Sequence, residues 1–191
     1  PSKVFNAVQF KGKTIAITVC EDIWNIGYEN PLYTACPMDE MMAQKPDFII
    51  NLSASPFSYD HANERIQLIR SNVLKYKIPM FYVNHYGSQT DIVFDGGSVV
   101  MSANGSIYDE MPYFEECIRT YELIDVELGQ KSQEQPKEKI DLILSDIRLP
   151  GNEETDGIEL LKWVRKNTQS KFILMTGFAE AFRTKLAFDI G

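Results

Sequence analysis

Short runs of apolar residues recur along the chain, and several of them end at a polar side chain. The run 13–19 is rich in β-branched residues and is followed at once by Cys20. A second run, 47–52, leads into the polar stretch 53–56, and a third covers 81–84. Such runs predict buried strands, and the polar stretches after them predict loops. The pattern therefore places Cys20 and the 53–56 loop at strand ends on the same edge of a sheet.

Other patterns predict a helix, a hairpin and a closing strand. Asp60 is a candidate N-cap for a helix whose apolar residues repeat on one face. Asn104 and Gly105 predict a hairpin turn. The stretch 121–128 alternates between apolar and polar residues, and it predicts a strand that closes the sheet. The face-forming residues of the helix are Ala62, Ile66, Ile69 and Val73.

A change of pattern divides the chain. Residues 1–128 form the first predicted domain, and the polar segment 129–139, which contains a proline and no aromatic residue, predicts a linker. From 140 to 191, two apolar runs alternate with amphipathic segments. Strands that alternate with helices predict a parallel α/β unit.

Composition narrows the class of protein. The chain has 191 residues with 44% apolar content, which is ordinary for a globular protein. Three cysteines cannot all pair, no stretch has the length of a membrane-spanning helix, and no signal peptide is evident. We therefore expect a soluble, cytoplasmic protein that contacts no membrane.

Charge argues against nucleic-acid binding. The first 128 residues carry nine Lys and Arg against seventeen Asp and Glu, whereas the remaining residues carry ten of each. With no basic face, the chain offers no source of affinity for a phosphate backbone.

Cys20 is the residue with the clearest chemical potential. A thiol at the carboxyl end of a buried strand lies where α/β folds place reactive groups, so Cys20 is a candidate nucleophile. Taken alone, the residue is more typical of a small buried hydrophobe, because free cysteines are often buried.

Several separated segments, in order, resemble the carbon–nitrogen hydrolase (nitrilase) superfamily over about residues 5–128. Within it they look most like the glutamine amidotransferase domain of glutamine-dependent NAD synthetases. The segments are Thr18–Trp24, Asp47–Phe57, Phe81–His85 and Asp91–Ser98. The resemblance implies a partial nitrilase-type αββα sandwich, no cofactor, and pairing into homo-oligomers.

The same resemblance assigns roles. Cys20 would attack the carboxamide of glutamine and form a thioester, while Glu21, Trp24 and Ser55 would bind the substrate and the Glu21 N–H would stabilise the oxyanion. The alternatives are a solvated acid for Glu21, a core residue for Trp24 and turn hydrogen bonding for Ser55. The family's Glu and Lys precede its Cys, and the chain holds no match before Cys20, so we expect no activity from these residues alone.

The later part resembles the receiver domain of response regulators, a CheY-like (flavodoxin-like) parallel α/β unit. The resemblance rests on 141–151, 156–157 and 174–177 and covers only the middle of such a domain. It implies that Asp146 accepts a phosphoryl group from a histidine kinase and binds Mg²⁺, and that Thr176 senses the phosphate. The family's acidic pair on the first strand and its later lysine have no counterpart, and Asp146 alone is also typical of a turn-capping acid.

Two functions follow from these patterns. The first is a glutamine-hydrolysing amidase that supplies ammonia, for NAD synthesis, joined to a phospho-acceptor receiver module. The alternative is a two-component signalling protein in which the receiver-like part regulates an inactive nitrilase-like scaffold.

Overall fold

The computed structural model describes residues 4–26, 35–130, 142–146, 162, 164–166 and 171–175. The chain divides into two compact units, residues 1–134 and residues 135–191. The division falls inside the segment that the sequence predicts to be a linker.

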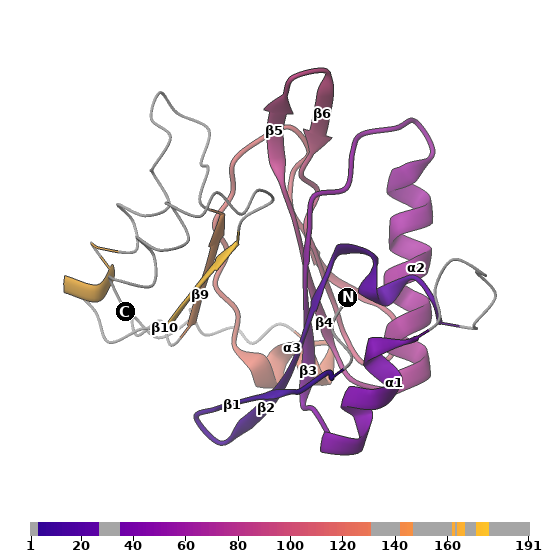
Figure 1. The fold of residues 1–191 in the computed structure, drawn as a ribbon, viewed down its shortest axis with the longest axis vertical. Coiled ribbons are helices and arrows are strands. Elements are labelled where there is room, and N and C mark those ends of the chain that lie inside the picture. Colours follow the sequence, from indigo (N-terminus) through magenta and orange to yellow (C-terminus); the bar gives the residue numbers. More distant parts are fainter. Residues whose placement is uncertain are drawn as a thin grey trace. The chain divides into compact units, whose positions relative to one another are not determined.

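The first unit is built on a mixed sheet of six strands in the order β1-β2-β3-β4-β7-β8 (Figure 1). Its strands are β1 (Val8–Phe10), β2 (Lys13–Val19), β3 (Phe48–Ser53), β4 (Met80–Asn84), β7 (Val99–Met101) and β8 (Ile107–Glu110). The central strands β2, β3 and β4 are parallel, whereas β1, β7 and β8 join antiparallel. A separate hairpin, β5 (Tyr86–Gln89) and β6 (Ile92–Asp95), projects from the carboxyl end of β4.

Helices cover one face of this sheet. They are α1 (Pro37–Met41), which continues into the 3₁₀ turn η2 (Met42–Gln44), and the long α2 (His61–Tyr76) (Figure 1). The parallel register aligns Ala16, Ile49 and Met80 across the sheet, and all three are fully buried against the helices. The core of the first unit therefore lies between α1, α2 and the centre of the sheet.

The predicted helix after Asp60 is confirmed as α2. Ile69 and Val73 are fully buried, as the apolar repeat predicts. Asp60 occupies the N-cap position, but its side chain makes no capping hydrogen bond. Lys77 caps the end of the helix with a left-handed backbone (φ 58°), and its N–H donates to the carbonyl of Val73.

The predicted hairpin at Asn104 and Gly105 is confirmed. It joins β7 to β8, and Gly105 has the positive φ (82°) that the turn requires. The side-chain Oδ1 of Asn104 accepts hydrogen bonds from the backbone N–H and the hydroxyl of Ser106.

The prediction of a strand at 121–128 is wrong, because this stretch forms the helix α3 (Leu123–Leu128). An eight-residue alternation also matches a short helix in which Leu123 and Val126 share a face. Val126 is fully buried, whereas Ile124 is 62% exposed, so the apolar residues do not all lie on one face of a strand. Gly129, with φ 67°, ends the helix in a left-handed conformation.

In the second unit, β9 (Leu142–Asp146) pairs in parallel with β10 (Lys171–Met175), as the sequence predicts for two strands of a parallel α/β unit. Residues 164–166 are helical, and Val164 is buried. Thr176 and most of the other residues behind the receiver prediction lie outside the described residues. No helix within the described part of the chain is long and apolar enough to cross a membrane.

Candidate active site at the carboxyl edge of the sheet

The structure places Cys20 directly after β2, as predicted, at the start of a 3₁₀ turn, η1 (Cys20–Ile23). The thiol is free and half-buried. The backbone of Cys20 is left-handed, with φ 49°. For a residue other than glycine this conformation costs roughly 1–2 kcal/mol, and such strain is concentrated at functional sites.

Ser53 lies beside Cys20 because β3 runs parallel to β2 and ends at the same edge. The hydroxyl Oγ of Ser53 is 3.9 Å from Sγ of Cys20 and is placed to donate a weak hydrogen bond to the sulfur. A donor to sulfur stabilises the thiolate, which is the nucleophilic form. This pair confirms that the two predicted strand ends meet.

Asn51 supports the turn that carries the thiol. Its side chain is fully buried on β3, and its Nδ2 donates to the carbonyl of Cys20 (3.3 Å) and to Oγ1 of Thr18 (3.0 Å). At the start of the turn, the carboxylate of Asp22 accepts a hydrogen bond from the N–H of Val19 (2.8 Å).

Tyr82 is a site residue that the sequence analysis missed. It lies opposite Asn51 on β4 and is 4% exposed. Burial raises the pKa of Tyr82, and the nearby side chain of Ser53 and the charge of Arg65 offset the rise only in part. The alternation of 81–84 was the available signal, because it places every second side chain on the face that carries the site.

Ser55 is held in place through its backbone. Its N–H donates to Oδ1 of Asn84 (2.9 Å), and Nδ2 of Asn84 donates to the carbonyl of Gly96 (2.7 Å) and to Asp95 (3.2 Å). Asp95 in turn accepts two hydrogen bonds from the guanidinium of Arg65, at 3.0 and 2.8 Å. A buried ionic network thus connects α2, β4 and β6 to the 53–56 loop.

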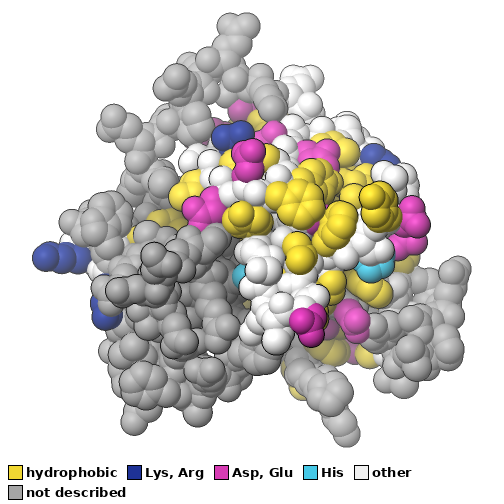
Figure 2. All heavy atoms as spheres, turned by 90° about the horizontal axis from the view of Figure 1, so that it is seen from above, with side chains coloured by type: hydrophobic (Ala, Val, Ile, Leu, Met, Phe, Trp, Pro, Cys, Tyr) yellow, Lys and Arg dark blue, Asp and Glu magenta, His cyan; other side chains and the backbone are white. Residues whose placement is uncertain are grey.

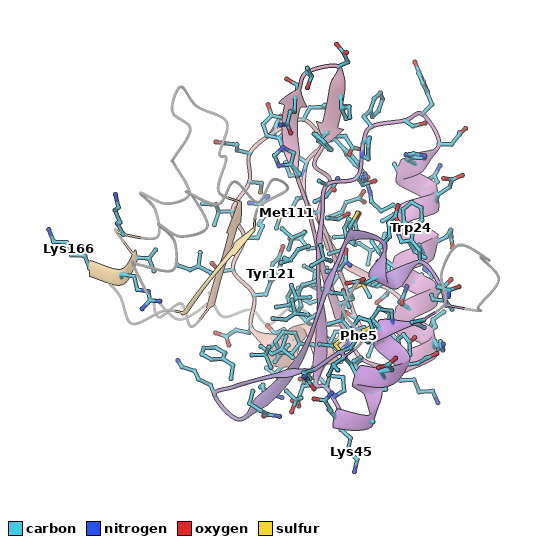
Figure 3. The ribbon with its side chains drawn as sticks, in the orientation of Figure 1. Phe5, Trp24, Lys45, Met111, Tyr121 and Lys166 are labelled. Atoms are coloured by element: carbon cyan, nitrogen blue, oxygen red, sulfur yellow. The ribbon has the colours of Figure 1, made fainter. Side chains whose placement is uncertain are left out.

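Glu21 and Trp24 lie on the turn after Cys20, and both side chains are exposed. Trp24 follows the last residue of η1 and lies beside α2, where it is 46% exposed (Figure 3). The alternative of a core tryptophan is therefore wrong. Their roles in substrate binding, and the role of the Glu21 N–H as an oxyanion donor, stay predictions.

Hydrophobic side chains gather on the end of the first unit that carries these strand ends (Figure 2). Phe57 packs edge-on against Phe114, with ring centroids 5.4 Å apart, and is also 6.2 Å from the ring of Tyr59. Ile92 and Val93 of β6 are about half exposed at the same end. The candidate site therefore lies on an end of the unit whose rim is apolar and aromatic.

The remaining predicted positions belong to the second unit. Asp146 is the last residue of β9 and pairs with Met175, so it stands at a strand end as predicted. Within the described ranges, no three His, Cys, Asp or Glu side chains form a group that could hold a metal ion.

Comparisons with known proteins give two kinds of similarity. No protein-family model matches the sequence. The chain is 35% identical over 127 residues to a glutamine-dependent NAD(+) synthetase from Synechocystis sp., covering 64% of this chain and 23% of that protein. It is 32% identical over 123 residues to the synthetase of Thermotoga maritima, covering 64% and 20%.

Solved structures give the second kind of similarity, which is one of fold. A carbon–nitrogen hydrolase from Helicobacter pylori G27 superposes with a TM-score of 0.52 at 20% identity, covering 61% of this chain and 42% of that one. This chain has a nitrilase-type fold. A glutamine-dependent NAD+ synthetase from Acinetobacter baumannii superposes with the same TM-score at 17% identity, covering 95% of this chain and 37% of that one.

Over about two thirds of its length, the chain is thus similar to a part of the glutamine-dependent NAD synthetases, and its fold is of the nitrilase type that the resemblance implies. The chain spans between a fifth and a quarter of the length of the two synthetases named by sequence. The receiver resemblance stays a prediction.

Proposed function

We propose that the first unit contributes the nucleophile of a glutamine-hydrolysing amidase. The observation that carries this proposal is the geometry of Cys20, a free, half-buried thiol in a left-handed turn at the carboxyl end of a parallel strand. The similarity to glutamine-dependent NAD synthetases supports glutamine as the small amide substrate, and NAD synthesis as the destination of the ammonia.

The reaction proceeds through a thioester. The thiolate of Cys20 attacks the carboxamide carbon of glutamine, and the carbonyl oxygen becomes an oxyanion that the N–H of Glu21 stabilises. The C–N bond then breaks, the nitrogen takes a proton and ammonia leaves. Water attacks the thioester, releasing glutamate and the thiol. Trp24 and Ser55 hold the substrate in this proposal, and the general base is assigned to no residue of the described chain.

The test is glutamate release from glutamine by the protein as its gene encodes it. Replacement of Cys20 by Ala removes the nucleophile, so we expect glutamate release to fall to the background rate. Cys117→Ala is the matched control, because Cys117 is also a free, half-buried thiol of the first unit. Equal rates of glutamate release by the two variants would contradict the assignment of Cys20 as the nucleophile.

The second unit supports a separate proposal, that of a phospho-acceptor. Its basis is the parallel pairing of β9 and β10, which places Asp146 at a strand end. The carboxylate oxygen of Asp146 would attack phosphorus and displace the leaving group of the donor, and Thr176 would respond to the new phosphate. The resemblance implies Mg²⁺, but the described residues form no metal-binding group, so no step is assigned to it.

Labelling with acetyl phosphate tests this second proposal. We expect one phosphoryl group per chain, lost in Asp146→Asn and retained in Asp141→Asn, which changes a neighbouring acid in the same way. Labelling that is the same in both variants, or absent from the unmodified protein, contradicts it.

A further inference from the structure

A side chain on the neighbouring strand β3 fixes the turn that carries Cys20. The carbonyl of Cys20 accepts a hydrogen bond from Asn51, which is 31 residues away in the chain and fully buried. A left-handed residue other than glycine persists only where its surroundings fix it. This contact acts directly on the peptide group of the strained residue.

The orientation of the Asn51 amide is fixed by its two partners. The carbonyl of Cys20 can only accept a hydrogen bond, so Nδ2 and not Oδ1 must face it. The second partner is Oγ1 of Thr18, 3.0 Å from Nδ2. Thr18 donates its own hydroxyl proton to the carbonyl of Ile50 (3.2 Å), which leaves Oγ1 as the acceptor.

The opposite end of the turn has an independent support. The side chain of Asn72 on α2 is also fully buried, and its Nδ2 donates to the carbonyl of Ile23 and to that of Leu68, both at 2.9 Å. Asn51 and Asn72 are thus similar in burial and in bonding, but only Asn51 contacts the residue that carries the thiol. This difference makes Asn72 a matched control.

We propose that Asn51 is a positioning residue that keeps the thiol of Cys20 against the hydroxyl of Ser53, and this rests on the proposed role of Cys20 as nucleophile. The argument is geometric. While the carbonyl of Cys20 is held, the left-handed turn keeps Sγ 3.9 Å from Oγ of Ser53. When the carbonyl is released, the residue relaxes toward an unstrained φ, and the thiolate loses the donor that stabilises it.

Alkylation by iodoacetamide tests the proposal without requiring turnover of glutamine. The rate is measured separately for each cysteine by mass spectrometry of its peptide, in the full chain at a fixed neutral pH. Asn51→Asp keeps the size of the side chain but removes its N–H donors. We expect the Cys20 rate to fall at least tenfold, with the Cys117 rate unchanged.

The control variant is Asn72→Asp, for which the Cys20 rate should stay within threefold of the unmodified chain. Equal effects of the two substitutions overturn the proposal, because they would reflect a general loosening of the turn. A Cys20 rate that stays within threefold in Asn51→Asp also overturns it.

Thr18→Val covers the case in which Asn51→Asp unfolds. Reaction of the buried Cys36 would report that unfolding. Valine matches threonine in shape but offers no acceptor to the amide of Asn51, so the Cys20 rate should fall at least threefold in a folded chain. An unchanged rate in Thr18→Val overturns the proposal.

Glutamine hydrolysis supplies the readout that separates positioning from binding. In the protein as its gene encodes it, Asn51→Asp should lower kcat by at least tenfold and leave KM within twofold. If no form of the protein hydrolyses glutamine while the alkylation pattern holds, the proposed substrate is wrong and the positioning role of Asn51 stands.

Discussion

The buried ion pair between Arg65 and Asp95 offers the sharpest test of how the site is held together. The two side chains are 4% and 2% exposed, and they share two hydrogen bonds of 3.0 and 2.8 Å. Burial lowers the pKa of Arg65, but the hydrogen bonds and charge of Asp95 outweigh it and raise the pKa above its ordinary value. The guanidinium therefore stays charged at any pH at which the protein is folded.

Asp95→Asn removes the negative charge and one of the two acceptors without changing the size of the side chain. The guanidinium cannot lose its proton, and its Nε already has no partner within the described residues. Breaking a buried pair from one side typically costs about 3–5 kcal/mol. We expect that loss in the free energy of unfolding, together with a looser 53–56 loop because Asp95 also anchors Asn84.

Glu127→Gln is the matched control. Glu127 makes an ion pair of similar length with Lys13 (3.2 Å), but the two side chains are 35% and 40% exposed. The same change of carboxylate to amide should therefore cost less than about 1 kcal/mol. Unfolding in urea is monitored by hydrogen exchange in β3 and β4, so the measurement reports on the first unit alone. A loss of less than about 1 kcal/mol for Asp95→Asn would refute the reasoning.

Two further predictions concern backbone strain and pH. A Cβ on Gly97 would overlap the ring of Tyr113 (2.7 Å from Cδ1), whereas one on Gly12 meets nothing within 4 Å, and both glycines have positive φ. Gly97→Ala should thus lower the free energy of unfolding in urea by about 1–3 kcal/mol more than Gly12→Ala, because the added methyl group overpacks the site, and equal free energies would contradict this. Burial, with hydrogen bonds to Cys36 and Asp39, raises the pKa of Tyr76 above its value in the unfolded chain. The contribution of Tyr76 to the free energy of unfolding is therefore complete below about pH 10 and is lost as the pH rises further. Between pH 8 and pH 11, the free energy of unfolding should fall less in Tyr76→Phe than in the unmodified chain, with a difference of up to about 1.4 kcal/mol per pH unit. The same pH dependence in both proteins would rule this out.

Local sequence pattern was sufficient to predict the frame of the site. The strands that end at Ser53 and Asn84 are rich in β-branched and aromatic residues, and such a composition predicts a strand without knowledge of the partner strand. Parallel pairing then brings Cys20 and Ser53 to one edge. The helix α2 was equally predictable, because its apolar residues repeat on one face from Ala62 to Val73.

What local pattern could not predict depends on distant partners. The left-handed backbone of Cys20 is held by Asn51 across 31 residues, and Arg65 reaches Asp95 across 30. Neither contact leaves a periodic signal in the sequence. The strand predicted at 121–128 failed for a different reason, since eight alternating residues match both periods, and the glycine that ends α3 was the signal for a helix.

The register of the three parallel strands explains why the site is both buried and polar. The row Ala16, Ile49 and Met80 is apolar, and the next row toward the carboxyl edge is Thr18, Asn51 and Tyr82, each no more than 4% exposed. Well-packed apolar side chains in that second row would satisfy the same burial without needing partners. Polar groups there bind one another and the backbone of Cys20, so they fix a conformation that hydrophobic packing alone has no direction to specify. The core thus changes within two residues of each strand from a layer that stabilises the fold to one that orients the thiol.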